Sequence, residues 1–350
     1  MHLKDIRKQR MHNQMITISS LAKPEDVVKH LIAVQSQEYA QAKWALGMRM
    51  VAANDATIEK AFNDGQILRT HVMRPTWHFV LPQDIRWLQQ LTSPRVHKLS
   101  LPYYKKTGID GKVMKKCCDA LEKMLQGNNY LTRPEIKTRL EKAKILADGV
   151  KLSYLMMQAE LDCVICSGPR QGKQFTYALV EERAPAVKSI SREDALAKLA
   201  LQYFTTRGPA TAHDFAWWSG LTVADANAGI EMVRGQLAHE VMDGKTYYYR
   251  PDVKHDGKKQ PATFLLPDYD EYGISYKDRT AIFGNANNAQ VLTNIFGHTV
   301  IADGEAAGTW QRIEKGKITT VELSLKKGLS TAKVTAINKA ADRYLKFIKP

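Results

Sequence analysis

Two glutamines separated by one residue, Gln35 and Gln37, are the first side chains whose type and spacing could do chemistry. Gln35 follows Val28 and Ile32 at helical spacing, so we expect it on the apolar face of a helix, where its amide needs hydrogen-bond partners. Residues i and i+2 of a continuous helix diverge, so both amides can meet in one pocket only if the helix ends or kinks near Ser36. The alternative is that one glutamine satisfies the unpaired carbonyls of a helix end.

A second group of candidate residues lies between Arg69 and His78, in a segment that predicts two strands joined by a turn at residues 73–75. Alternation places Arg69 and His71 on one face of the first strand, and Trp77 and His78 on opposite faces of the second. A basic hairpin with an aromatic residue can follow phosphates and insert beside a base. The alternative is a half-buried hairpin with solvated arginines.

Three carboxylates, those of Asp268, Asp270 and Glu271, follow a predicted strand within four residues. Paired carboxylates could perform acid–base work or hold a metal, which makes Asp268 and Asp270 a candidate secondary acid site. The alternative is a solvated turn or a helix start. The chain has no dinucleotide-binding glycine motif, P-loop, zinc-hydrolase helix motif or nucleophile elbow, so we expect neither a cofactor nor a metal.

The charge of the chain favours a polyanionic partner. The 350 residues include 51 Lys and Arg against 36 Asp and Glu, which gives a formal charge of +15. Residues 1–120 hold 19 basic and 10 acidic side chains, or +9 of that total, so a polyanion is expected to bind there. Nucleic acid and an anionic membrane surface are the two partners that suit such a charge.

Other features of the sequence favour an intracellular protein that does not enter a membrane. No stretch approaches the ~18 uninterrupted apolar residues of a spanning helix, and the N-terminal residues lack a secretory apolar core. The four cysteines lie at positions 117, 118, 163 and 166. They are too few and too irregularly spaced for a disulfide framework or a zinc site. We therefore expect core cysteines in a reducing cytoplasm.

Three segments repeat one order, in which helices with start signals are followed by two short β-like runs and a turn, as in a winged helix-turn-helix unit. The predicted hairpins cover residues 68–81, 161–180 and 241–249. The first segment opens with a helix from Pro24 to Val34. Thr132 and Glu135 form a capping box that starts the second segment, and an Asp-Gly turn at residues 243–244 closes the third.

The remaining sequence predicts connecting helices at residues 82–100 and 111–126, and a different kind of structure after Pro261. There, alternating runs at 263–266, 298–302, 308–312 and 317–323 are separated by Gly and Asp turns, and an amphipathic helix covers 330–348. We predict an α+β protein with three tandem winged helix-turn-helix units at 1–105, 106–190 and 191–260. A small β-rich domain with a closing helix follows at 261–350.

Segments spread over most of the chain resemble the winged-helix DNA glycosylases of the AlkZ/YcaQ-like family. They are Ala33–Gln37, Leu68–Val80, Thr206–Thr211 with Asp214–Leu221, Leu266–Tyr272, and Gly304 with Gly308–Trp310. The resemblance implies tandem winged helices around a DNA channel and a β-rich C-terminal domain. It also implies the removal of alkylated bases, in some members those joined in interstrand crosslinks.

The catalytic signature of that family falls on Gln35, Ser36 and Gln37. The Gln-x-Gln form is similar to the crosslink-unhooking branch, although Ser36 stands where the family usually has an apolar residue. An N7-alkylated guanine is already cationic and departs readily, so the enzyme must mainly place a water against an oxocarbenium-like sugar. Two neutral amides can hold one water and direct it to C1′, which is the role expected of Gln35 and Gln37.

The resemblance also indicates the partner, which is double-stranded DNA with alkylated bases or crosslinks, bound by a monomer. Eight side chains are predicted to contact it: Arg69, His71, Arg74, Trp77, His78, Lys98, Arg170 and Lys173. We expect a cytoplasmic protein that is nucleoid-associated when bound. Two alternatives stay open: a non-enzymatic winged-helix regulator that reads the major groove, and a hydrolase that uses Asp268, Asp270 and Glu271.

Overall fold

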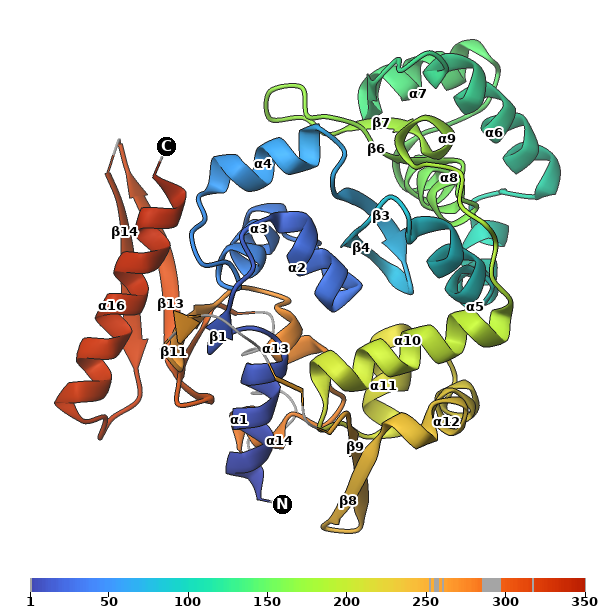
Figure 1. Ribbon diagram of the computed structural model, residues 1–350. Coiled ribbons are helices and arrows are strands. Elements are labelled where there is room, and N and C mark those ends of the chain that lie inside the picture. Colours follow the sequence, from blue (N-terminus) through green and yellow to red (C-terminus); the bar gives the residue numbers. More distant parts are fainter. Residues whose placement is uncertain are drawn as a thin grey trace. The chain divides into compact units, whose positions relative to one another are not determined.

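The computed structural model describes residues 2–251, 253–254, 258–259, 261–284, 297–316 and 318–349. The chain divides into two compact units, each built from helices and strands (Figure 1). Unit 1 comprises Met1–Glu59, Ala197–Trp218 and Thr222–Pro350, and unit 2 comprises Lys60–Leu196 and Ser219–Leu221. The α+β class predicted from the sequence is confirmed.

Unit 1 begins with short helices and strands. They are α1 (Leu3–Asn13), β1 (Ile18–Ser19), α2 (Pro24–Leu31), β2 (Ala33–Gln35), α3 (Tyr39–Gly47) and α4 (Asp55–Asn63), the last of which runs into unit 2. Helix α1 was not predicted, because its segment is strongly polar and has no apolar periodicity. Two of its polar side chains are nevertheless buried and paired: Arg10 Nε donates to Pro209 O at 2.9 Å, and Asn13 Nδ2 donates to Gly208 O at 2.9 Å.

The next part of unit 1 follows the predicted order of helices and then a hairpin. Its elements are α10 (Arg192–Arg207), α11 (Ala212–Ser219), α12 (Val223–Met232), the 3-10 turn η1 (Arg234–Gln236), β8 (Ala238–Met242) and β9 (Lys245–Tyr249). Strands β8 and β9 pair antiparallel around Asp243 and Gly244, whose φ angles of 51° and 71° suit a two-residue hairpin turn. The predicted third hairpin is confirmed.

The C-terminal part of unit 1 is the predicted sheet with a closing helix. Antiparallel strands β11 (Thr263–Leu266), β12 (Thr299–Ala302), β13 (Glu305–Lys315) and β14 (Ile318–Leu325) lie in that order, and β10 (Lys258–Lys259) pairs with β1. Helix α16 (Thr331–Ile348) runs along this sheet (Figure 1), with Tyr344 against Trp310 at 4.7 Å between ring centroids. The short helices α13 (Glu271–Ile274) and α14 (Thr280–Phe283) follow β11. Strand β13 is longer than predicted, and Lys317, predicted to start the last strand, lies outside the described residues.

Unit 2 contains two hairpins and a group of helices. Its elements are β3 (Leu68–Val72), β4 (Arg74–Val80), α5 (Ile85–Lys106), α6 (Gly111–Leu125), β5 (Leu131–Thr132), α7 (Arg133–Lys142), α8 (Gly149–Leu161), β6 (Ile165–Ser167), β7 (Thr176–Leu179) and α9 (Val180–Arg183). Both connecting helices are confirmed as α5 and α6. The backbone N–H and hydroxyl of Thr132 both donate to Glu135, so the predicted capping box opens α7.

The second hairpin is confirmed with shorter strands than predicted. Leu161 was expected to start a strand, but it is the last residue of α8 and lies four residues after the buried Met157, on the same face of that helix. Strand β6 starts only at Ile165 and pairs antiparallel with β7. Each of the three segments therefore has helices before a hairpin, while their assignment as winged helices stays a prediction.

Candidate active site

Gln35 lies at the end of a strand, so its predicted place on a helix was wrong. Helix α2 ends at Leu31, and Ile32 has the left-handed φ of 66°, a conformation that a helix cannot continue through. The chain then becomes extended as β2. Arg207 explains why the helix stops: Nη1 donates to Leu31 O and Nη2 to Ala33 O, each at 3.0 Å.

Because the chain is not helical at Gln35, helix geometry does not prevent the Gln35 and Gln37 amides from reaching the same pocket. In a continuous helix the side chains of Gln35 and Gln37 would point apart. Helix α2 ends at Leu31, four residues before Gln35, whereas the sequence predicted an end near Ser36. Gln35 is 6% exposed and Ser36 is fully buried, whereas Gln37 is partly exposed. Arg207, rather than a glutamine, takes the Leu31 carbonyl at the helix end.

The backbone of Gln35 is held by a carboxylate 236 residues further along the chain. Gln35 N donates to Glu271 Oε1 at 3.0 Å. The other oxygen, Oε2, accepts hydrogen bonds from three side chains: Arg207 (Nη2 at 2.8 Å), Ser275 (Oγ at 2.6 Å) and Trp218 (Nε1 at 2.8 Å). Arg207 and Glu271 are both fully buried, and the guanidinium lies 4.1 Å above the Trp218 ring. Residues from four resemblance segments thus meet in one network.

The network keeps Glu271 ionised. Burial alone would raise the pKa of this carboxyl, but the charge of Arg207 and the hydrogen bonds from Ser275 and Gln35 N lower it to about 2. An anion whose oxygens accept from so many donors is a poor proton acceptor in catalysis. Glu271 therefore has a structural role in this arrangement.

Asp270 is likewise buried, so the solvated turn considered for this segment was wrong. Arg49 Nη1 donates to Asp270 Oδ2 at 2.7 Å and Nη2 donates to Oδ1 at 2.9 Å, with both side chains fully buried. Asp270 Oδ1 also accepts from Tyr272 N and caps α13, so the alternative of a helix start is confirmed. These contacts favour a structural role for Asp270 over the secondary acid role.

Asp268 differs from its two acidic neighbours. Its side chain is 15% exposed, and Oδ2 lies 3.7 Å from His298 Nε2. Burial, together with the charge of Glu38, raises the pKa of Asp268 to about 6. Burial thus favours the protonated form of Asp268, and its acid–base role stays a prediction.

The predicted basic hairpin in unit 2 has the predicted faces. Strands β3 and β4 pair with His71 opposite Trp77, around a turn at Met73 whose φ is 62°. The Arg69 guanidinium lies 4.4 Å from the Trp77 ring centre and 4.6 Å from that of Phe175. The His71 ring lies 4.3 Å from that of Trp77, so the cation and both rings share one face.

The base of this hairpin is packed into unit 2. Arg69 and His71 are each 8% exposed and His78 is fully buried, so the solvated arginine considered from the sequence was wrong for Arg69. His71 Nδ1 forms a hydrogen bond with the buried Glu160 carboxylate. As folded, these three side chains have little surface with which to touch DNA. Arg74 and Trp77 retain partial exposure near the turn.

The other predicted DNA contacts lie on exposed parts of unit 2. Lys98 is exposed on α5, and Lys173 is exposed in the turn between β6 and β7. In the same turn, Arg170 Nη2 donates to Lys173 O at 2.6 Å and its guanidinium lies 5.0 Å from the Phe175 ring centre. The DNA-binding roles of all eight residues stay predictions.

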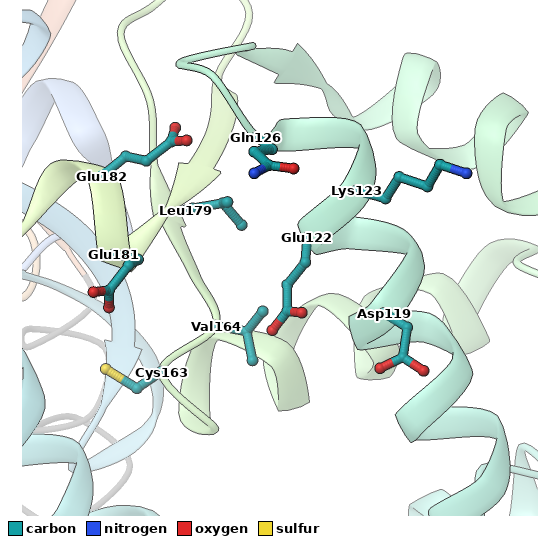
Figure 2. Close-up of a pocket in the computed structure, with 9 residues that line it drawn as sticks. All are labelled: Asp119, Glu122, Lys123, Gln126, Cys163, Val164, Leu179, Glu181 and Glu182. Atoms are coloured by element: carbon teal, nitrogen blue, oxygen red, sulfur yellow. The ribbon is translucent and has the colours of Figure 1, made fainter.

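A cavity of about 700 Å³ in unit 2 has the wrong charge for DNA (Figure 2). Its lining includes the carboxylates of Asp119, Glu122, Glu181 and Glu182. Three of them are engaged locally, with Lys115, with Arg86 and with the backbone N–H groups of residues 127 and 128. Four carboxylates against one lysine, Lys123, make this lining unfavourable for phosphate contacts.

Two further results concern metal and membrane. Across the part of the chain that the structure describes, no group of three or more His, Cys, Asp and Glu side chains is arranged to hold a metal ion. Within the same residues, every helix is too short or too polar to span a bilayer.

Comparison with known proteins assigns the fold and the family. The model of the family described as DNA glycosylase AlkZ-like matches residues 28–347. The chain belongs to this family of DNA glycosylases. This AlkZ-like chain is 22% identical over 332 residues to an interstrand DNA cross-link repair glycosylase of Streptomyces sahachiroi, covering 89% of this chain and 88% of that one.

A solved structure shows that the AlkZ-like chain shares the fold of a known family member. The structure of the Streptomyces sahachiroi DNA glycosylase AlkZ superimposes with a TM-score of 0.78, over 98% of this chain and 96% of that chain, at 19% identity. The family resemblance drawn from sequence segments is therefore confirmed, together with the DNA glycosylase class.

The sequence interpretation missed the residues that hold Gln35. Arg207, Trp218 and Glu271 were noticed as resemblance segments or as separate features, without a link to Gln35. One signal could have found them: a buried arginine and a buried carboxylate pair with each other, and separate motifs of the chain can supply the two partners, as Arg207 and Glu271 do across 64 residues.

Proposed function

We propose that the protein is a monofunctional DNA glycosylase that hydrolyses the N-glycosidic bond of cationic N7-alkylated purines. Family membership supports the reaction class, and the Gln-x-Gln segment supports the mechanism. The observation that carries the proposal is the placement of Gln35 and Gln37. Gln35 ends a short strand whose backbone is fixed by Arg207 and Glu271, and Gln37 follows two residues later and is partly exposed.

The reaction requires the protein mainly to hold a water in position with neutral polar groups. N7 alkylation makes the purine a cationic leaving group, so the bond to C1′ breaks without a strong general acid. An amide both donates and accepts hydrogen bonds, so Gln35 and Gln37 can orient one water toward C1′ while staying neutral beside an oxocarbenium-like sugar. The water oxygen bonds to C1′ and gives one proton to the surrounding water, since the amides stay neutral, and the cationic base leaves as a neutral base with its bonding electron pair.

We further propose interstrand crosslinks as substrates. The Streptomyces sahachiroi relative is named for interstrand DNA cross-link repair, and the Gln-x-Gln form is similar to the crosslink-unhooking branch. A crosslink joined through purine N7 atoms contains the same cationic glycosidic bond as a monoadduct. Ser36, which replaces the usual apolar residue, is fully buried and so sits in a position suited to a small side chain.

DNA binding is proposed for the helix–hairpin segments, acting as three winged-helix units of a cytoplasmic monomer without a cofactor. The accessible members of the predicted set are Arg74, Trp77, Lys98, Arg170 and Lys173. Cationic side chains on turns and on the surface of a helix suit phosphate contacts, which would give strong salt dependence with little sequence preference.

Single-turnover release of N7-methylguanine from a duplex oligonucleotide tests the proposal. We expect the wild type to release the free base and leave an abasic site, and the Gln35→Ala, Gln37→Ala double variant to bind the duplex without releasing it. Crosslinked duplex is the second substrate. Binding without release from either substrate by the wild type would overturn the proposal in favour of a winged-helix regulator.

A further inference from the structure

The backbone of the segment that leads into Gln35 is bound by both members of an ion pair, Arg207 and Glu271. Arg207 donates to the carbonyl oxygens of Leu31 and Ala33, and Glu271 accepts from the N–H of Gln35. These three main-chain groups lie within five residues. The segment between the end of α2 and Gln35 therefore depends on two side chains that come from distant parts of the sequence.

The pair is itself fixed. Arg207 Nε donates to Ser275 Oγ at 3.0 Å, and Ser275 Oγ donates to Glu271 Oε2 at 2.6 Å. Trp218 donates to the same oxygen and its ring lies beneath the guanidinium. Side chains with this many buried partners have few alternative rotamers, so they can transmit a fixed position to the backbone that they contact.

We propose that Glu271 and Arg207 are positioning residues for the water-directing amides, acting through the backbone of residues 31–35. This inference rests on the proposed glycosylase function. A shift of about 1 Å in a group that orients a reactant can lower the rate by about 100-fold. Loss of the contact to Gln35 N therefore slows base release even when the protein stays folded and binds DNA.

The decisive variant is Glu271→Gln, because it keeps the volume and removes the charge. The new amide nitrogen cannot accept a hydrogen bond, so one of the two oxygens that accept from Gln35 N, Arg207, Ser275 and Trp218 is lost. We expect the single-turnover release rate at saturating enzyme to fall about 10- to 100-fold. The dissociation constant for the same duplex should stay within about twofold, because no predicted DNA contact is altered.

A matched control separates positioning from stability. Asp214 is a fully buried carboxylate of the same unit, and it accepts from the backbone N–H groups of Lys277, Asp278 and Thr211, which lie outside residues 31–37. Asp214→Asn should lower the melting temperature while leaving the release rate within about threefold of wild type, measured well below the melting temperature of each variant. Equal rate losses in the two variants would overturn the proposal, as would a wild-type rate for Glu271→Gln.

A milder variant covers the case in which Glu271→Gln does not fold. Ser275→Ala removes one donor to Glu271 and one acceptor for Arg207, and should lower the release rate several-fold with unchanged DNA affinity. A wild-type rate for this variant would contradict the proposal. If the wild type releases no base, the proposed function fails, and if Gln35→Ala releases the base normally, the water-directing role of Gln35 fails. If Gln35→Ala is inactive while Glu271→Gln and Ser275→Ala are normal, only the positioning role fails.

Discussion

The network around Gln35 in unit 1 and the β3–β4 hairpin in unit 2 use charge in different ways. In unit 1, the Arg207–Glu271 and Arg49–Asp270 pairs are fully buried and each partner has several hydrogen bonds. In the hairpin, Arg69 lies over two aromatic rings and the turn keeps partial exposure. The first arrangement fixes a backbone, and the second leaves Arg74 and the Trp77 ring partly exposed near the turn.

The largest expected effect is the loss of the buried carboxylate. Glu271→Ala leaves Arg207 buried without its counter-charge, and we expect the free energy of unfolding to fall by about 3–5 kcal/mol. Urea denaturation at pH 7 measures this change. Glu322→Ala, an exposed position on β14, should change it by less than about 0.5 kcal/mol. A Glu271→Ala protein as stable as the wild type would remove the main distinction between the two regions.

A smaller loss is expected in the hairpin. Arg69→Ala removes the contacts of the guanidinium with Trp77 and Phe175, and should lower the free energy of unfolding by about 1–3 kcal/mol. Lys112→Ala, an exposed position on α6 in the same unit, serves as the control and should have almost no effect. If Arg69→Ala costs no stability, the cation is not packed against the rings in solution.

The third prediction concerns pH and Asp268. Its pKa is raised to about 6 in the folded protein, above the unfolded value, so the folded state binds more protons and loses stability as pH rises from about 4 to about 6. Asp268→Asn removes this loss, so the variant should be more stable than the wild type at pH 7, by roughly 1 kcal/mol after allowing for solvent screening, and not at pH 4. Equal stability profiles between pH 4 and pH 7 would contradict the raised pKa.

Glu271 should behave in the opposite way. Its pKa is lowered to about 2, below the unfolded value, so its stabilising contribution is present above about pH 4.5 and is lost as pH falls toward 2. Acid titration of wild type and Glu271→Gln would show the contrast directly, because only the wild type should lose stability through this group in that window.

The smallest effect is expected for single exposed cations. Arg74→Ala and Lys173→Ala should each weaken duplex binding and reduce the slope of log affinity against log salt by about 1, with little change in stability. Lys326→Ala, exposed at the end of the C-terminal sheet, should leave the slope unchanged. An unchanged slope for both Arg74→Ala and Lys173→Ala would place the phosphate contacts elsewhere.

Local signals in the sequence predicted much of the fold. The Thr132–Glu135 capping box, the Asp243–Gly244 turn and the alternation in β3 and β4 are interactions between near neighbours, so they can be read without knowing the tertiary structure. The closing helix and its sheet were found for the same reason, since their apolar periodicity is strong. The family was recognised because its motifs occur in order along the chain.

The failures have a common cause, which is partners far away in the sequence. The apolar run from Ile32 to Val34 fits a helix as well as a strand, and the α2 end at Leu31 depends on Arg207, 176 residues later. The acidic segment at Asp270 and Glu271 looked solvated because its counter-ions, Arg49 and Arg207, belong to other elements. The periodicity of a single segment therefore cannot predict where α2 ends or that Asp270 and Glu271 are buried.

Replacement of Gln37 tests the central claim most directly. Gln37 is partly exposed, so Gln37→Ala removes an amide without opening a large cavity in the core. We predict that single-turnover release of N7-methylguanine at saturating enzyme falls about 100-fold while duplex affinity and melting temperature stay near wild type. Gln311→Ala, at an exposed glutamine on β13, should release the base normally. A Gln37→Ala enzyme that releases the base at the wild-type rate would contradict the water-positioning role.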